Sequence, residues 1–145
     1  MTAARSSAIS NTTIGQKLAL AIGVVYTLVG ILGFVVTGFD NFAGVTGETL
    51  LGFEVNPLHN IVHLLIGVAG LALWRTREGA KTYGLLLAVG YGLAFVYGLF
   101  AAGNDDINFL SINGADNGLH LLSALAGVAV YLLADDRNRS GSRTR

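Results

Sequence analysis

Four stretches of this chain, each about 20 residues long, contain no Asp, Glu, Lys or Arg. They lie between Lys17 and Asp40, Glu54 and Arg75, Lys81 and Asp105, and Asp116 and Asp135. A helix that crosses a bilayer core needs about 17–25 mostly apolar residues. Only 12% of the chain is charged and 52% is hydrophobic, whereas a soluble domain carries about a quarter charged residues. The pattern predicts an all-α membrane protein, a bundle of four transmembrane helices.

The expected helices cover residues 17–38, 57–74, 81–103 and 114–134, and form one membrane domain over residues 17–134. A polar N-terminal tail should cover residues 1–16. Residues 135–145 carry several Arg and Ser, a composition typical of a disordered basic tail.

The basic residues predict the orientation of the helices. All nine lie in the two tails or in the second loop: Arg5, Lys17, Arg75, Arg77, Lys81, Arg137, Arg139, Arg143 and Arg145. The other two loops are acidic and contain no Lys or Arg. Because basic loops stay on the cytoplasmic side, we expect a multi-pass protein of the cell membrane with both termini cytoplasmic.

The two halves of the chain resemble each other. Residues 60–73 (NIVHLLIGVAGLAL) align with residues 117–130 (NGLHLLSALAGVAV) at an offset of 57. The preceding helices align at an offset of 65, which pairs Tyr26 with Tyr91 and Gly33 with Gly98. We therefore expect two tandem two-helix repeats, at about 17–74 and 81–134, related by an axis along the membrane normal.

A polar motif occurs once in each half, at the start of the second helix. Asn56, His59, Asn60 and His63 form the first copy, and Asn113, Asp116, Asn117 and His120 form the second. The spacing places each set on one helix face. Asn56 and Asn113 are expected to be helix N-caps. The remaining six side chains are the candidate polar or ligand site, since polar groups are costly to expose to lipid.

Several roles for these side chains stay open at this stage. The Asn and His side chains can hydrogen-bond between the two halves. His63 and His120 can hold a haem b between helices, with small residues such as Gly67, Gly70 and Gly127 making room for the macrocycle. His59, His63, His120 and Asp116 can ligate a transition metal or bind a proton.

Other chemistry finds little support in the sequence. The chain contains no cysteine, which excludes disulfides and thiol chemistry, and it carries no nucleotide-binding or hydrolase motif. The favoured function is therefore a non-enzymatic membrane scaffold, partner subunit or small-ligand binder without a cofactor. The alternative is a haem- or metal-binding redox protein centred on His63 and His120. The lipid bilayer is the expected partner, nucleic acid is not, and a membrane-protein partner or a second copy of the chain stays open.

Two runs carry a resemblance to a known family: NPLHNIVHLLIGVAGL at residues 56–71 and the later ADNGLHLLSALAGV. The chain resembles the membrane family catalogued as domain of unknown function 4383 over roughly residues 15–134. This resemblance implies a small four-span protein without an established activity. The four-span architecture is also loosely similar to that of DoxX-type membrane proteins.

Overall fold

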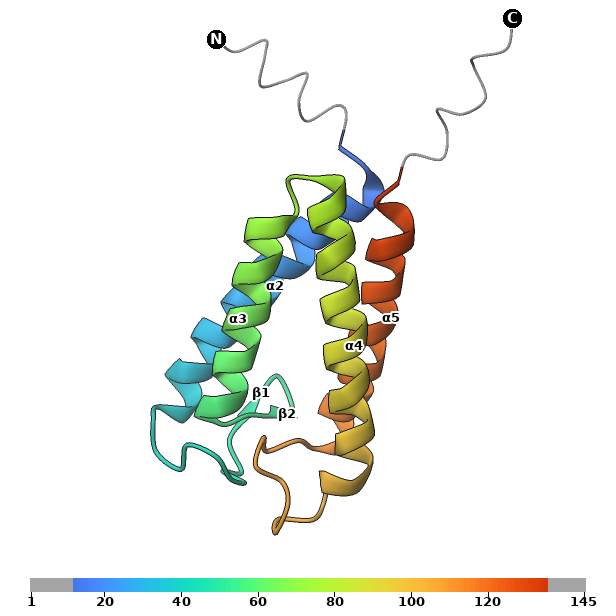
Figure 1. Ribbon diagram of the computed structural model, residues 1–145. Helices are drawn as coiled ribbons and strands as arrows, with labels where there is room; N and C mark the ends of the chain where they lie inside the picture. The colour runs from blue at the N-terminus through green and yellow to red at the C-terminus, as the bar shows by residue number, and fades with distance from the viewer. Residues whose placement is uncertain (1–11, 136–145) are drawn as a thin grey trace, which may run out of the picture.

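The computed structural model describes residues 12–135 and contains four α-helices in that range. Helices α2 (Ile14–Thr37), α3 (Pro57–Leu73), α4 (Arg77–Ala101) and α5 (Gly114–Leu133) run alternately up and down (Figure 1). Strands β1 (Thr49–Leu50) and β2 (Phe53–Glu54) form a short antiparallel hairpin between α2 and α3. The predicted tails fall outside the described residues, apart from residues 12–16 and 135.

The helix boundaries follow from local capping. Thr13 and Gln16 form a reciprocal capping box, so α2 begins three residues before the predicted start. The Thr76 hydroxyl accepts a hydrogen bond from the Gly79 amide, which starts α4 at Arg77 instead of residue 81. A charged first turn is compatible with a membrane helix because the turn lies at the water interface.

The bundle consists of two helical hairpins. Helix α2 packs closely on α3, and α4 packs closely on α5, with fewer contacts between the two pairs. Glycine makes this possible: a Cβ at Gly23 would lie 2.9 Å from the carbonyl carbon of Gly70. In the second hairpin a Cβ at Gly84 would lie 2.7 Å from the carbonyl oxygen of Gly127. Gly23 of α2 and Gly84 of α4 therefore allow close packing inside each hairpin.

The distribution of polarity is the reverse of that in a soluble domain. The buried residues of α3 are Pro, His, Asn and Gly, whereas Leu65 and Val68 on its outer side are more than half exposed. Val35, Leu93 and Phe100 are also largely exposed. Helices α2, α4 and α5 are long and apolar enough to cross a membrane, and α3 is an apolar helix of 17 residues. These features are those of an integral membrane protein.

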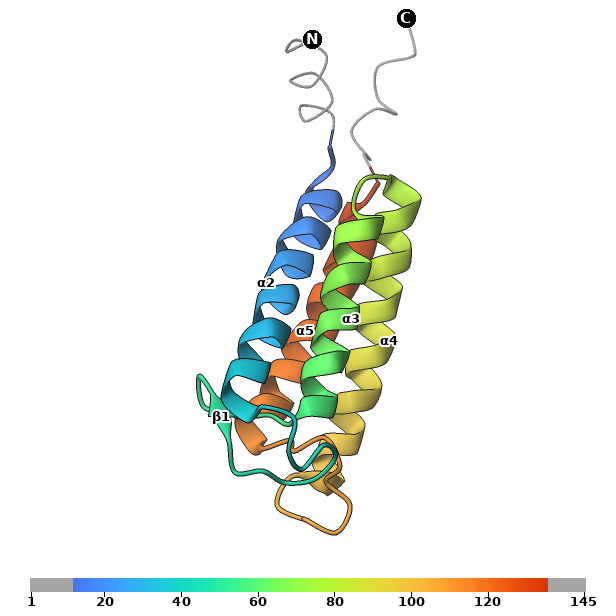
Figure 2. The same cartoon turned by 90° about the vertical axis from the view of Figure 1, so that its left-hand side faces the viewer.

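The two ends of the bundle differ. The start of α2, the turn between α3 and α4 and the end of α5 lie together at one end (Figures 1 and 2). The β-hairpin and the loop between α4 and α5 lie together at the other end, which we call the loop end. The β-hairpin was not predicted. Its two turn residues, Leu51 and Gly52, both have positive φ angles of 56° and 91°, the conformation of a tight hairpin turn.

Candidate functional site

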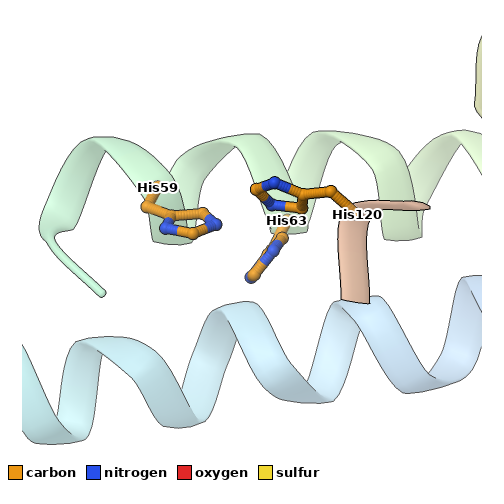
Figure 3. Close-up of side chains that lie close together, drawn as sticks. All are labelled: His59, His63 and His120. Carbon is orange, nitrogen blue, oxygen red and sulfur yellow. The ribbon is translucent and has the colours of Figure 1, made fainter. Parts of the chain in front are cut away.

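Three histidine rings converge inside the bundle near the loop end. His59 and His63 project from α3, and His120 approaches them from α5 (Figure 3). The ring centroids lie 4.4 Å apart for His59 and His63, and 5.7 Å apart for His59 and His120. One ring nitrogen of each histidine lies within 4.8 Å of the others. The structure thus brings all three histidines of the chain together in one place.

Asp116 joins this cluster from α5. Its Oδ2 lies 3.5 Å from Nε2 of His120 and 3.7 Å from Nε2 of His59. The four side chains are at most 3% exposed. We call His59, His63, His120 and Asp116 the His/Asp cluster. It contains both residues of the one aligned position at which the motif copies differ, since Asp116 stands where the first copy has His59.

The protonation of His59 follows from its hydrogen bond. The carbonyl oxygen of Leu110 lies 2.9 Å from its Nδ1, and a carbonyl only accepts, so Nδ1 carries the hydrogen. In the neutral ring, Nε2 then presents a lone pair, and this lone pair faces a carboxylate oxygen of Asp116. Neither Asp116 oxygen has a hydrogen-bond partner. Two acceptors therefore oppose each other in a buried site.

Asn56 and Asn113 cap their helices and also connect the two halves. Oδ1 of Asn56 accepts from the His59 amide at 2.8 Å, and Oδ1 of Asn113 accepts from the Asp116 amide at 2.9 Å. The Asn56 amide group donates to the carbonyl of Phe109, and that of Asn113 donates to the carbonyl of Gly52. Each cap thereby fixes a loop of the other half beside the cluster.

Asn60 and Asn117 occupy matching places in the two hairpins. The Asn60 side chain lies against Gly33 of α2, and the Asn117 side chain lies against Gly98 of α4. Asn60 also donates to the Thr37 hydroxyl at 3.0 Å. These amides contact the neighbouring helix of their own hairpin, where the missing Cβ of glycine leaves space for them. The polar contacts between the halves come instead from the His/Asp cluster, from the caps, and from the pairs Tyr26–Ser123 and Thr46–Ser111.

Two tyrosines and a serine surround the cluster, and the sequence reasoning did not place them there. The Tyr26 ring lies 5.2 Å from that of His63, and the Tyr91 ring lies 5.4 Å from that of His120. The hydroxyls of Tyr26 and Ser123 are 2.5 Å apart. The alignment of Tyr26 with Tyr91 at the repeat offset was the available signal, because each tyrosine packs on the histidine of its own half.

Two cavities reach the cluster. One has a volume of about 310 Å³, lies between α2 and α5, and is lined by His63 and Asp116 at its polar part. The other has a volume of about 90 Å³, lies between α3 and α4, and is lined by all three histidines. The cluster is thus buried in protein but adjoins space large enough for water or a ligand.

Comparison with known proteins places the chain in a family. Residues 16–133 match the family model described as domain of unknown function (DUF4383). No curated protein and no solved structure matches the chain. The looser likeness to DoxX-type membrane proteins remains a prediction from architecture.

Proposed function

We propose that this chain, which belongs to the DUF4383 family, is an integral membrane protein that holds a divalent transition-metal ion. The ligands in this proposal are His59, His63 and His120, with Asp116 as the carboxylate ligand. The proposal adopts the metal-binding alternative of the sequence reasoning and makes no claim about redox chemistry.

One observation carries the proposal: the carboxylate of Asp116 faces the Nε2 lone pair of His59 in a buried site, and neither of its oxygens has a hydrogen-bond partner. A buried charge is retained in proteins where it is paired or coordinates a metal. A divalent cation between Oδ2 and the Nε2 atoms would convert the repulsion between acceptors into shared coordination. It would also balance the negative charge at membrane depth.

The donor set suits such an ion. Three imidazoles and one carboxylate are ligands for zinc, iron or copper. Zinc–nitrogen bonds of about 2.0–2.1 Å place tetrahedral ligand atoms about 3.3 Å apart, so the largest separation of 4.8 Å has to contract on binding. The bond from His59 to the Leu110 carbonyl is the kind of outer contact that orients a metal-bound histidine.

A haem fits this arrangement less well. The cavity lined by the three histidines measures about 90 Å³, whereas pockets for organic ligands start at about 300 Å³. The glycines expected to make room for a macrocycle are occupied in helix packing. Gly67 and Gly70 lie against α2, and Gly127 lies against α4.

A scaffold without a cofactor is the second candidate. The observation that favours it is the pair of caps, since the amides of Asn56 and Asn113 each bind a loop of the opposite half. In this case the cluster would only join the two hairpins, and removing a histidine would lower stability without changing metal content.

The experiment that separates these candidates measures metal binding directly. The purified protein is stripped with a chelator and titrated with Zn²⁺ by calorimetry, and elemental analysis gives the metal content before stripping. We expect one tightly bound ion per chain, and an affinity at least tenfold lower in His63→Ala and His120→Ala. Asp106→Asn is the control, because Asp106 is an exposed acidic residue of the α4–α5 loop. Wild-type binding no tighter than that of the two histidine variants would refute the proposal, and a haem spectrum would favour the other cofactor.

We further propose that the chain contains two tandem repeats and crosses the cell membrane four times with both termini cytoplasmic. The matching contacts of Asn60 with Gly33 and of Asn117 with Gly98 support the repeat. Helix α3 is about 26 Å long at 1.5 Å per residue, close to the 30 Å of a bilayer core. The described basic residues lie at the end opposite the loop end, which supports the orientation.

The absence of cysteine makes this topology easy to test. Single-cysteine variants Asp105→Cys and Arg75→Cys place a thiol at the loop end and at the opposite end. A membrane-impermeant thiol reagent added to intact cells should label the first variant and not the second. The reverse labelling pattern would overturn the orientation.

A further inference from the structure

The two cavities beside the His/Asp cluster correspond to each other in the two halves. The offsets of 65 and 57 that align the halves pair Tyr26 with Tyr91 and His63 with His120. The first member of each pair lines the larger cavity and the second lines the smaller one. The cavities thus have the same construction, and each differs from the other at identifiable positions.

The two cavities differ in volume and in their polar lining, and the larger one has an unpartnered carboxylate. Asp116 lines the larger cavity, whereas His59 stands at the aligned position of the smaller one. Ser123 likewise lines the larger cavity, and Ile66 is its counterpart. The larger and the smaller cavity have volumes of about 310 Å³ and 90 Å³. Ser123 is held by Tyr26, but packing alone gives no reason for an unpaired aspartate to line the larger space.

The larger cavity opens towards the apolar surface of the bundle. Helices α2 and α5, which contribute its walls, approach each other at the end opposite the loop end and diverge towards the loop end in Figure 1. Val25 of α2 and Leu122 of α5 line the cavity and are 55% and 64% exposed. The cavity is also lined by Leu50, Leu51 and Phe53 of the β-hairpin, so the hairpin covers the cavity on the side of the loop end. A molecule dissolved in the bilayer could enter between the two helices.

We propose that this cavity binds a lipid-soluble phenol, with its hydroxyl at Asp116 and its apolar chain directed into the bilayer. Asp116 is 1% exposed and its oxygens have no donor, so the complementary group on a ligand is a hydrogen-bond donor. Oδ2 is the oxygen near His59 and His120, which leaves Oδ1 for the ligand. The proposal needs the carboxylate but not the metal ion.

An aromatic ring suits the surroundings of that hydroxyl. The rings of Tyr26, His63 and Phe53 line the cavity, and aromatic pairs add to the energy of simple burial. A volume near 310 Å³ lies at the lower end of the range for ligand pockets, so it accommodates a ring while the chain extends into lipid. An anionic head group would be repelled by the carboxylate.

Photolabelling of the protein in phosphatidylcholine vesicles tests the proposal. The probe is a 4-alkylphenol with a diazirine in its alkyl chain, and labelled residues are mapped by mass spectrometry. Labelling should concentrate on the α2 and α5 residues that line the cavity. 4-Nonylphenol should compete at least tenfold better than its methyl ether, which lacks the donor. Equal competition by the ether, stronger competition by nonylamine, or labelling spread evenly over all lipid-facing helices would overturn the proposal.

The aligned residues supply matched variants. Ser123→Ile introduces the residue found in the smaller cavity and should reduce labelling at least tenfold. Ile66→Ser makes the converse change in the other half and should leave labelling unchanged. Ser123→Ala keeps the space open and should give a smaller loss than Ser123→Ile, which preserves a test if the larger side chain prevents folding. Equal labelling of all three variants would contradict the proposal.

These measurements are made on chelator-treated protein, with Zn²⁺ titrated into a parallel sample. If the protein binds no Zn²⁺ but the phenol probe still labels the cavity, only the metal site is refuted. Intact Zn²⁺ binding without localised labelling would refute only the phenol site.

Discussion

Replacing Asp116 with asparagine should stabilise the metal-free protein, and Zn²⁺ should remove most or all of that gain. The substitution keeps the shape of the side chain and removes its charge. An asparagine amide at this position can donate to an imidazole lone pair, where the carboxylate oxygen lies 3.5 Å and 3.7 Å from two Nε2 atoms. In metal-free protein the variant thus gains a hydrogen bond where the wild type has opposing acceptors.

The expected magnitudes follow from the burial of the site. An unsatisfied buried polar group costs about 1–3 kcal/mol, so we expect the metal-free variant to be more stable than the wild type by about that amount. At a Zn²⁺ concentration 100 times the dissociation constant, the wild type gains about 2.7 kcal/mol. A variant that binds about 100-fold more weakly gains only about 0.4 kcal/mol under the same conditions. The metal should therefore remove most or all of the advantage of the variant.

The assay is unfolding of the detergent-solubilised protein, followed by circular dichroism with chelator and with Zn²⁺. Asp106→Asn, an exposed change in the α4–α5 loop, should behave like the wild type in both conditions. A metal-free Asp116→Asn protein that is less stable than the wild type would refute the reasoning, because it would mean that a proton already links Asp116 to an imidazole. An equal Zn²⁺ effect in the variant and the wild type would remove Asp116 from the ligand set.

Two further predictions concern packing. Gly33→Ala places a methyl group into the Asn60 side chain and should lower the free energy of unfolding by about 1–3 kcal/mol, whereas Gly92→Ala, which has open space around it, should not destabilise the protein. Equal effects would contradict the proposed fit, and the same unfolding assay measures both. A double-mutant cycle of Tyr26→Phe and Ser123→Ala should give a coupling of about 0.6 kcal/mol, with an upper bound near 1.7 kcal/mol. Additive effects in that cycle would mean that the two hydroxyls do not form a stabilising bond.

The membrane helices were largely predictable because charge is excluded from a bilayer core. The charge-free segments located all four helices, and the asparagine before Pro57 marked the start of α3. The start of α4 was less predictable, because charged residues at the water interface belong to the helix without belonging to the apolar segment. The β-hairpin gave no sequence signal, since Leu51 is an unusual residue for a position with positive φ.

The site was predictable only in part. The motif spacing identified the residues that face the interior, because polar groups avoid lipid. It could not identify which helix each of them meets, and Asn60 in fact meets Gly33 inside its own hairpin. Tyr26 and Tyr91 were harder to interpret, because a membrane helix is apolar on both its lipid-facing and its protein-facing sides. Hydrophobic periodicity therefore does not reveal the buried face of such a helix.

The close packing within each hairpin has a consequence for the order of assembly. The contacts of α2 with α3, and of α4 with α5, join segments close in sequence, so each hairpin can form as soon as it enters the bilayer. The His/Asp cluster draws on both hairpins, and it is complete only after the two have docked. Occupation of the cluster is then a marker of the finished protein, and any ligand bound there favours the docked state over separated hairpins.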